Sequence, residues 1–228
     1  MMFFPSLNRR RNRALVGYLE PYMKDRDVVL DYGCGDGALM IHLQRACGEN
    51  RKAIKVTGYD PVERAVSFRR WVTIFNSLVR LPKISYSVCL LVDVVHHMGE
   101  RSQTVSSDVY DSVGEEFGKA ISLITPHARI LIKDYVISPS PFLAFSQRSF
   151  LAFKDSITNP KEVNKSFAYF TLHQWYQLFS KFNLRLITVQ DVPYLPLERV
   201  YQSIAGKPVL FLLERNHSRP SRSCFPQP

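Results

Sequence analysis

Cysteine, long apolar runs and acidic residues are all scarce in this 228-residue sequence. The four cysteines, at positions 34, 47, 89 and 224, show neither metal-site nor disulfide spacing. We therefore expect free thiols, no metal and a reducing compartment, with the cytoplasm as the default location. No apolar run reaches the roughly 20 residues that cross a membrane, so we expect no transmembrane segment. The charge in residues 1–11 follows the short apolar piece, which is the reverse of a secretory signal.

The shortage of acidic residues leaves a net charge of +10, which favours anionic partners such as nucleic acid or an anionic membrane surface. Much of this charge lies near the two ends, in the run Arg9–Arg13 and at Arg215, Arg219 and Arg222. Basic ends are commonly solvated tails, so the charge keeps an RNA hypothesis open without establishing it. The hydrophobic content of 46% is ordinary for one globular domain of this length.

The most informative stretch is Val28-Val-Leu-Asp-Tyr-Gly-Cys-Gly-Asp-Gly37. An apolar run ends in Asp31, glycines follow at every second position, and a helical pattern then begins. This order predicts a buried strand, a tight turn and a helix start. Glycines allow unusual backbone angles and close approach of a ligand, and the amides at the helix start would face an acidic or polar ligand group.

The glycines alone leave two interpretations open. Gly33-x-Gly35-x-x-Ala38 satisfies the loose dinucleotide-binding fingerprint. Asp31, two residues before the first glycine, favours the other interpretation, because Asp-x-Gly-x-Gly-x-Gly resembles the first motif of class I S-adenosylmethionine-dependent methyltransferases. In that family the acidic residue lies near the methionine end of the cofactor and the glycine backbone packs beneath it.

Strand and helix patterns alternate along the chain. We expect strands at 28–31, 54–60, 71–76, 86–93, 128–134, 184–189 and 208–214, and helices at 12–24, 38–48, 61–70, 109–124 and 172–182. For the third strand, a helix continuing from Val62 through Phe75 fits the periodicity equally well. The alternation predicts an α/β fold with a parallel sheet and helices on both faces. The phenylalanine-rich segment 139–155 has helical spacing and is expected to pack in the core or as a lid.

Three regions are expected. They are a basic segment with a capping helix at 1–24, the main domain at 25–214, and a disordered tail at 215–228. The helix at 12–24 could cap the ligand site or could simply pack against the domain. Thr171-Leu-His-Gln174 is a capping-box pattern, which marks the start of the helix at 172–182.

Asp60 ends the second expected strand, about one βα unit beyond the glycines, and Pro61 follows it. A carboxylate at this position can accept hydrogen bonds from both hydroxyls of a ribose, because a vicinal diol offers two donors and a carboxylate two acceptors. Strand, acid and spacing therefore agree on a site for a cofactor that contains adenosine.

The fourth strand runs into Val92-Asp-Val-Val-His-His-Met98. This segment closely resembles the Asp-Val-Leu-His-His segment of the small-molecule branch of class I methyltransferases called methyltransferase type 11. The resemblance covers residues 25–214 and implies a Rossmann-like sheet of seven strands, mostly parallel, with the last strand inserted antiparallel. It also implies S-adenosyl-L-methionine as the cofactor.

The resemblance assigns a set of cofactor-binding residues: Asp31, Gly33, Cys34, Gly35, Gly37, Asp60, Pro61, Asn76 and Asp93. Asn76, expected near the adenine, stands where the family usually has an acidic residue. The Asn/Asp-Pro-Pro-Tyr segment of amino-group DNA methyltransferases is absent. No Lys-Asp-Lys-Glu set of ribose 2′-O-methyltransferases is evident either. Both absences count against nucleic acid as the substrate.

His96 and His97 follow the fourth strand, where an imidazole could remove a proton from a phenol or hydroxyl, or orient a substrate. The alternative is a non-catalytic role, in which one histidine packs or hydrogen-bonds to the backbone and the other lines the cofactor pocket. Asp134 ends the fifth strand and could orient a histidine or bind substrate, or could be a helix cap or loop-closing acid. Lys133 alternates with Asp134, so their side chains should point to opposite faces of the sheet.

We therefore expect a methyltransferase that acts on a small-molecule acceptor, with oxygen as the expected acceptor atom and His96, His97 and Asp134 as its catalytic residues. One alternative is an RNA methyltransferase that uses the basic N-terminus. Another is a non-catalytic module that keeps the cofactor-binding fold and binds a partner.

Overall fold

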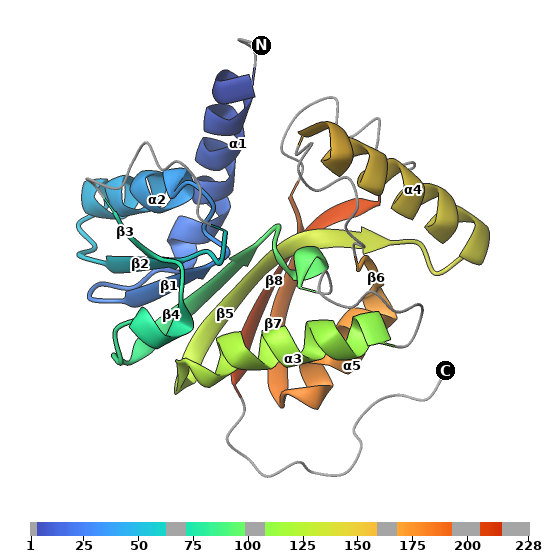
Figure 1. Ribbon diagram of the computed structural model, residues 1–228. Helices are drawn as coiled ribbons and strands as arrows, with labels where there is room; N and C mark the ends of the chain where they lie inside the picture. The colour runs from blue at the N-terminus through green and yellow to red at the C-terminus, as the bar shows by residue number, and fades with distance from the viewer. Residues whose placement is uncertain (1–3, 63–71, 99–107, 159–167, 193–205, 216–228) are drawn as a thin grey trace.

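The computed structural model describes residues 4–62, 72–98, 108–158, 168–192 and 206–215. Its centre is an eight-stranded sheet in the order β3-β2-β1-β4-β5-β8-β7, with β6 paired to β5 (Figure 1). The strands are β1 (Val28–Tyr32), β2 (Lys55–Tyr59), β3 (Thr73–Phe75), β4 (Tyr86–Val92), β5 (Ile124–Ile137), β6 (Phe170–Thr171), β7 (Leu184–Asp191) and β8 (Lys207–Arg215). Strand β8 lies antiparallel between β5 and β7, whereas the strands from β3 to β5 are parallel. The predicted Rossmann-like sheet is confirmed.

Helices cover both faces of this sheet (Figure 1). They are α1 (Phe4–Leu19), α2 (Ala38–Glu49), α3 (Asp108–Ser122), α4 (Pro141–Thr158) and α5 (Leu172–Lys181), with short 3-10 turns η1 (Glu20–Tyr22), η2 (Leu78–Arg80) and η3 (Val95–His97). None of the helices in the described ranges is both long and apolar enough to cross a membrane.

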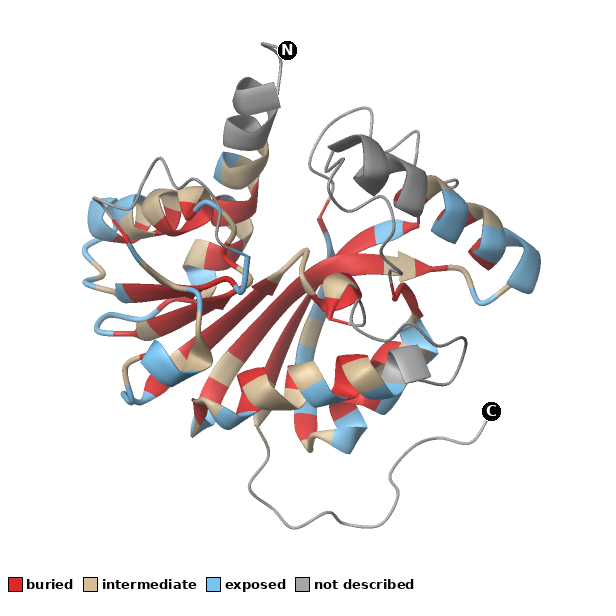
Figure 2. Cartoon of the chain, in the orientation of Figure 1, coloured by how far each residue is buried: buried red, intermediate tan, exposed pale blue. Residues whose placement is uncertain are grey.

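Strand alternation divides the core into two layers. In β5, Ile130 and Ile132 pack with the layer under α3 and α5, while Leu131 between them packs with the layer under α1 and α2. The central strands are buried along nearly their whole length because both of their faces are covered (Figure 2). This alternation also sends Lys133 and Asp134 to opposite faces, as predicted.

Several element boundaries differ from the expectations. Helix α1 begins at Phe4 rather than at residue 12, and it gives way to η1 where Pro21 lacks the amide that an α-helix interior needs. Ile124, expected at the end of a helix, starts β5 instead, because it pairs with Tyr86 in the sheet. The two-residue strand β6 was not predicted. Residues 73–75 form a strand, so the helical alternative for them is wrong.

Other expectations have mixed outcomes. The capping box is present: the Thr171 hydroxyl accepts the Gln174 amide, and the Gln174 side chain accepts the Thr171 amide. Phe142 and Phe145, expected in core or lid packing, lie on an outer face of α4 with 78% and 70% of their surface exposed. The helix expected at 61–70 and the tail expected at 215–228 lie almost entirely outside the described residues.

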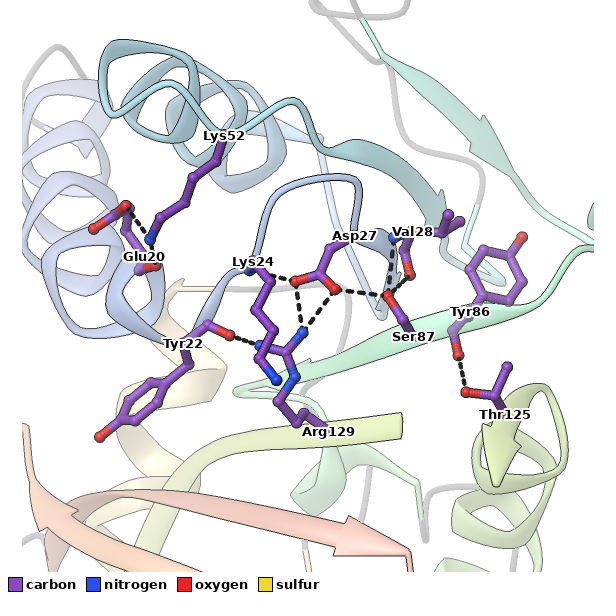
Figure 3. Close-up of polar contacts among 10 residues, drawn as sticks. All are labelled: Glu20, Tyr22, Lys24, Asp27, Val28, Lys52, Tyr86, Ser87, Thr125 and Arg129. Carbon is purple, nitrogen blue, oxygen red and sulfur yellow. Dashed lines mark hydrogen bonds and ion pairs between the residues drawn. The ribbon is translucent and has the colours of Figure 1, made fainter. Parts of the chain in front are cut away.

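A buried polar cluster ties the N-terminal segment to the amino ends of the central strands (Figure 3). The Arg129 guanidinium donates to both carboxylate oxygens of Asp27, each at 2.7 Å, and also to the Tyr22 carbonyl. Asp27 also accepts from the Ser87 hydroxyl at 2.9 Å and from the Lys24 amide at 2.6 Å. Since only 12% of the Arg129 side chain and 6% of the Asp27 side chain are exposed, each ion depends on its partner.

Replacing Arg129 tests this dependence. Arg129→Met leaves the Asp27 carboxylate buried without its cation, so we expect a loss of about 3–5 kcal/mol in the free energy of unfolding, measured by chemical denaturation. The matched control is Arg185→Met, which breaks an exposed pair with Glu214 and should cost under about 1 kcal/mol. Equal losses in the two variants would show that the cluster is not a stabilising anchor.

Candidate functional site

Four carboxyl groups lie where the central parallel strands end. Asp31 is in β1, Asp60 follows β2, Asp93 follows β4 and Asp134 lies in β5. Because these strands run parallel and are direct neighbours in the sheet, their carboxyl ends meet along one edge. The carboxyl groups have different partners, so each is described separately.

The glycine loop joins β1 to α2, and all three of its glycines have positive φ. A Cβ on Gly33 would lie 2.2 Å from the Val94 side chain, and one on Gly37 would lie 2.9 Å from Val72. Packing therefore requires glycine at both positions. A Cβ on Gly35 (φ +58°) would meet no atom within 4 Å. As far as the described residues go, the middle of the loop is thus open space, which a ligand can approach.

Cys34 is part of the packing of this loop. Its amide and that of Gly33 donate to the Tyr59 carbonyl at 3.1 and 2.7 Å, which ties the loop to the end of β2. The Cys34 side chain is buried, and its sulfur would lie 2.6 Å from a Cβ on Gly58. Burial, followed by the charges of Asp31 and Asp60, raises the pKa of the Cys34 thiol well above its usual range. Cys34 therefore remains a neutral thiol.

Asp31 is 2% exposed, and its Oδ2 is buried without a hydrogen-bond partner among the described residues. Burial, with a further contribution from the charge of Asp60, raises the pKa of Asp31 to about 7. A buried carboxyl oxygen without a donor is unfavourable in the protein alone. This atom is therefore placed to receive a donor or a cation from a ligand.

Asp60 holds the glycine loop from the neighbouring strand. Its Oδ2 accepts the Gly35 amide at 2.8 Å and its Oδ1 accepts the Val62 amide at 2.9 Å. A carboxylate oxygen can accept more than one hydrogen bond, so a carboxylate that holds backbone amides can also accept from a diol. Pro61 and Asn76 are exposed at the ends of β2 and β3, which the bond from the Asp60 amide to the Phe75 carbonyl ties together.

Asp93, assigned to the cofactor from the resemblance, forms ion pairs within the protein. Its carboxylate contacts the side chains of Lys133 from β5 and Arg11 from α1. Burial by itself would raise the pKa of Asp93, but the charges of Lys133 and Arg11 and the hydrogen bond from Lys133 lower it well below the usual range. The Arg11 contact was not predicted, because this residue stands in a basic run that resembles a solvated tail.

His96 and Asp134 form the second group at this edge. The Asp134 carboxylate, 1% exposed, lies 2.8 Å from Nδ1 of His96 and also accepts the His96 amide at 3.2 Å. An ionised carboxylate can only accept, so Nδ1 carries a proton, and in the neutral imidazole the lone pair is then on Nε2. The Tyr169 ring is stacked on the His96 ring with centroids 5.2 Å apart, and the Ala168 amide donates to the His96 carbonyl. The imidazole is thus fixed in both orientation and tautomer.

His97 differs from His96 in its surroundings. It is half-buried rather than buried, and its ring centroid lies 4.1 Å from that of His96. Of the three catalytic candidates, the structure joins His96 and Asp134 directly and places His97 beside them. Residue spacing identified the members of this group, but not which histidine the carboxylate contacts.

The sequence matches a known protein family, and the fold resembles that of solved structures. A family model described as a methyltransferase domain matches residues 6–189. No curated protein matches the sequence.

Three solved structures are similar in fold. The 1,6-didemethyltoxoflavin-N1-methyltransferase of Burkholderia thailandensis, with bound 1,6-didemethyltoxoflavin and S-adenosylhomocysteine, is 16% identical with a TM-score of 0.60, over 90% of this chain and 78% of that one. The geranyl diphosphate C-methyltransferase of Streptomyces coelicolor, also with S-adenosylhomocysteine, is 13% identical with a TM-score of 0.58, over 89% and 76%. A mitomycin 7-O-methyltransferase is 16% identical with a TM-score of 0.60, over 92% and 54%.

The raised pKa of Asp31 predicts a pH-dependent stability. Its pKa is about 7 in the fold and near 3.8 in the unfolded chain, so the folded state binds more protons between these values. Stability of the ligand-free protein should therefore fall as pH rises through this window. Asp31→Asn should remove this part of the fall. We expect the variant to be more stable than the parent at pH 8 and close to it at pH 4, as measured by chemical denaturation. A stability difference that is the same at both pH values would contradict this expectation.

Proposed function

Because the chain belongs to the family of methyltransferase domains and is an S-adenosylmethionine-dependent methyltransferase, we propose that it methylates an oxygen of a small-molecule acceptor with His96 as the general base. The observation that carries the proposal is the pairing of His96 with Asp134 at the strand edge that also holds the glycine loop. An imidazole that a carboxylate holds in one orientation can act as a general base without first having to reorient.

The residues of the edge fit the cofactor. Within the described ranges, Gly35 has open space beside it, and the Asp31 oxygen that has no partner there suits the cationic methionine end. Asp60 suits the ribose hydroxyls. Pro61, Asn76 and the remaining loop residues complete the expected binding set. When bound, the cofactor supplies an activated methyl group on a sulfonium.

His96 has the chemistry that methylation at oxygen needs. A hydroxyl or phenol becomes a stronger nucleophile as it loses its proton, and Nε2 of His96 is the ring nitrogen that can take it. Asp134 keeps Nδ1 protonated and stabilises the imidazolium that forms, in the way a carboxylate supports a histidine in hydrolase triads. The two residues thus have separate roles, in which His96 moves the proton and Asp134 orients the ring.

The contacts of Arg11 favour a small acceptor over RNA. An RNA methyltransferase that used the run Arg9–Arg13 would present these side chains to phosphates. Arg11 instead turns inward to Asp93, and 38% of its side chain is exposed. The proposal is tested by a mass-detected methylation screen over a metabolite extract and total RNA. A new methyl group found only on RNA would overturn it.

Cofactor binding can be tested at Gly35. In Gly35→Ala the new methyl group occupies the open space of the loop, and we expect at least a tenfold loss of affinity for S-adenosylhomocysteine by calorimetry, with a folding cost of about 1–2 kcal/mol from the left-handed backbone. Gly48→Ala is the matched control, because it makes the same chemical change in α2, where a Cβ would meet no atom of the described residues within 4 Å. Unchanged affinity in Gly35→Ala would place the cofactor elsewhere.

The general base is tested at His96. His96→Gln should lower the rate of methyl transfer about 10²- to 10⁴-fold, while S-adenosylhomocysteine affinity stays within about twofold. Asp134→Asn should also slow transfer, because the amide no longer selects the tautomer with the lone pair on Nε2. His173→Gln, on the exposed face of α5, should leave the rate unchanged. Full activity in His96→Gln would exclude this residue as the base.

A further inference from the structure

The backbone conformation of a single residue, Asp93, sets the position of His96. The chain leaves β4 at Val92, and Asp93 then adopts φ +51°, a left-handed conformation that is uncommon for a residue with a side chain. The 3-10 turn that carries His96 begins two residues later. A change in the backbone conformation of Asp93 would therefore displace the imidazole of His96.

Lys133 holds this turn from β5 through two separate contacts. Its carbonyl accepts the Asp93 amide at 2.8 Å, and its ammonium group pairs with the Asp93 carboxylate. The Lys133 side chain is 1% exposed, and its Nζ lies 4.5 Å from the centroid of the Tyr135 ring. Asp93 also pairs with Arg11, so its carboxylate keeps one cation when Lys133 is removed. The buried Lys133 ammonium, by contrast, depends on its ion pair with Asp93, because burial of a charge that has lost its ion-pair partner is strongly destabilising.

The next residue of β5 holds the other end of the same turn. Asp134 points to the opposite face of the sheet and binds both the amide and Nδ1 of His96. Two consecutive residues of β5 thus bind the start and the end of the segment 93–96, from opposite faces of the sheet. The hydrogen bond between Asp134 and the His96 ring forms only if the turn places the ring beside the carboxylate.

We propose that Lys133 is a positioning residue of the methyl-transfer reaction, which acts through the Asp93 turn to hold His96 against Asp134. The inference rests on the proposed function of His96 as the base, and it assigns to Lys133 no contact with acceptor or cofactor. The conformation of the turn is the link: with the Lys133 ammonium in place, Asp93 stays left-handed and His96 stays within reach of the Asp134 carboxylate.

The test reads the His96–Asp134 hydrogen bond directly in the ligand-free protein. A proton on Nδ1 shared with a carboxylate gives a downfield proton signal in NMR, and this signal is identified by its loss in His96→Gln and Asp134→Asn. In Lys133→Met we expect the signal to disappear or broaden although the protein still folds. Lys133→Arg, which keeps the positive charge, should retain it in part.

Two further variants make the result decisive. Asp93→Asn removes the carboxylate that pairs with both Lys133 and Arg11, with little change of shape, so it should also weaken the signal, and it serves if Lys133→Met does not fold. Because both residues act through one contact, the double variant should be no worse than the more affected single variant. Lys52→Met is the matched control: it breaks a lysine–carboxylate pair with Glu20 away from the site and should leave the signal intact.

The outcomes separate this inference from the proposed function. A normal signal in folded Lys133→Met and Asp93→Asn would overturn the positioning role and leave Lys133 with a stabilising role only. Loss of the signal with a reduced rate of methyl transfer supports the inference. Loss of the signal with full methyl transfer supports the positioning but overturns His96 as the base, which His96→Gln reports independently.

Discussion

The contact between the glycine loop and the turn after β4 is the constraint on which the rest of the site depends. Gly33 lies so close to the Val94 side chain that any Cβ there would overlap it. This close approach brings two neighbouring strand ends together, one with the open loop and the other with His96. A residue other than glycine would push the two segments apart, and it would separate the proposed cofactor-binding residues from the proposed catalytic ones.

The buried charges of the protein are satisfied differently at the two edges of the sheet. At the amino edge, Asp27 is saturated by Arg129, Ser87 and a backbone amide, so that cluster serves stability. At the carboxyl edge, no described residue donates to one oxygen of Asp31, and burial raises the pKa of this carboxyl group above its ordinary value. A fold accepts such a cost where a ligand is to supply the missing partner.

The fold does not determine which atom is methylated. The three similar solved structures carry names that place the methyl group on nitrogen, carbon and oxygen. The acceptor atom must therefore depend on the local groups beside the cofactor, as is general for widely used folds. In this chain the local group that we propose is the His96 imidazole, which the Asp134 carboxylate orients for proton removal.

The sequence by itself determined which candidate residues stand at the ends of which strands. Asp31 precedes the three glycines, Asp60 ends the second strand, and His96 and Asp134 stand at the ends of the next two central strands. It could do so because buried strands, glycine turns and helix starts are local patterns of a few residues. The ends of α1 and β5, the short strand β6 and the exposure of Phe142 were not predictable, since packing of distant segments decides them.

The partners within the site were not predictable for the same reason. His96 and Asp134 are 38 positions apart, Asp93 and Lys133 are 40 apart, and Arg11 and Asp93 are 82 apart. Only the tertiary structure decided these pairs, because the sheet must form before the strand ends, and the charges on them, lie side by side.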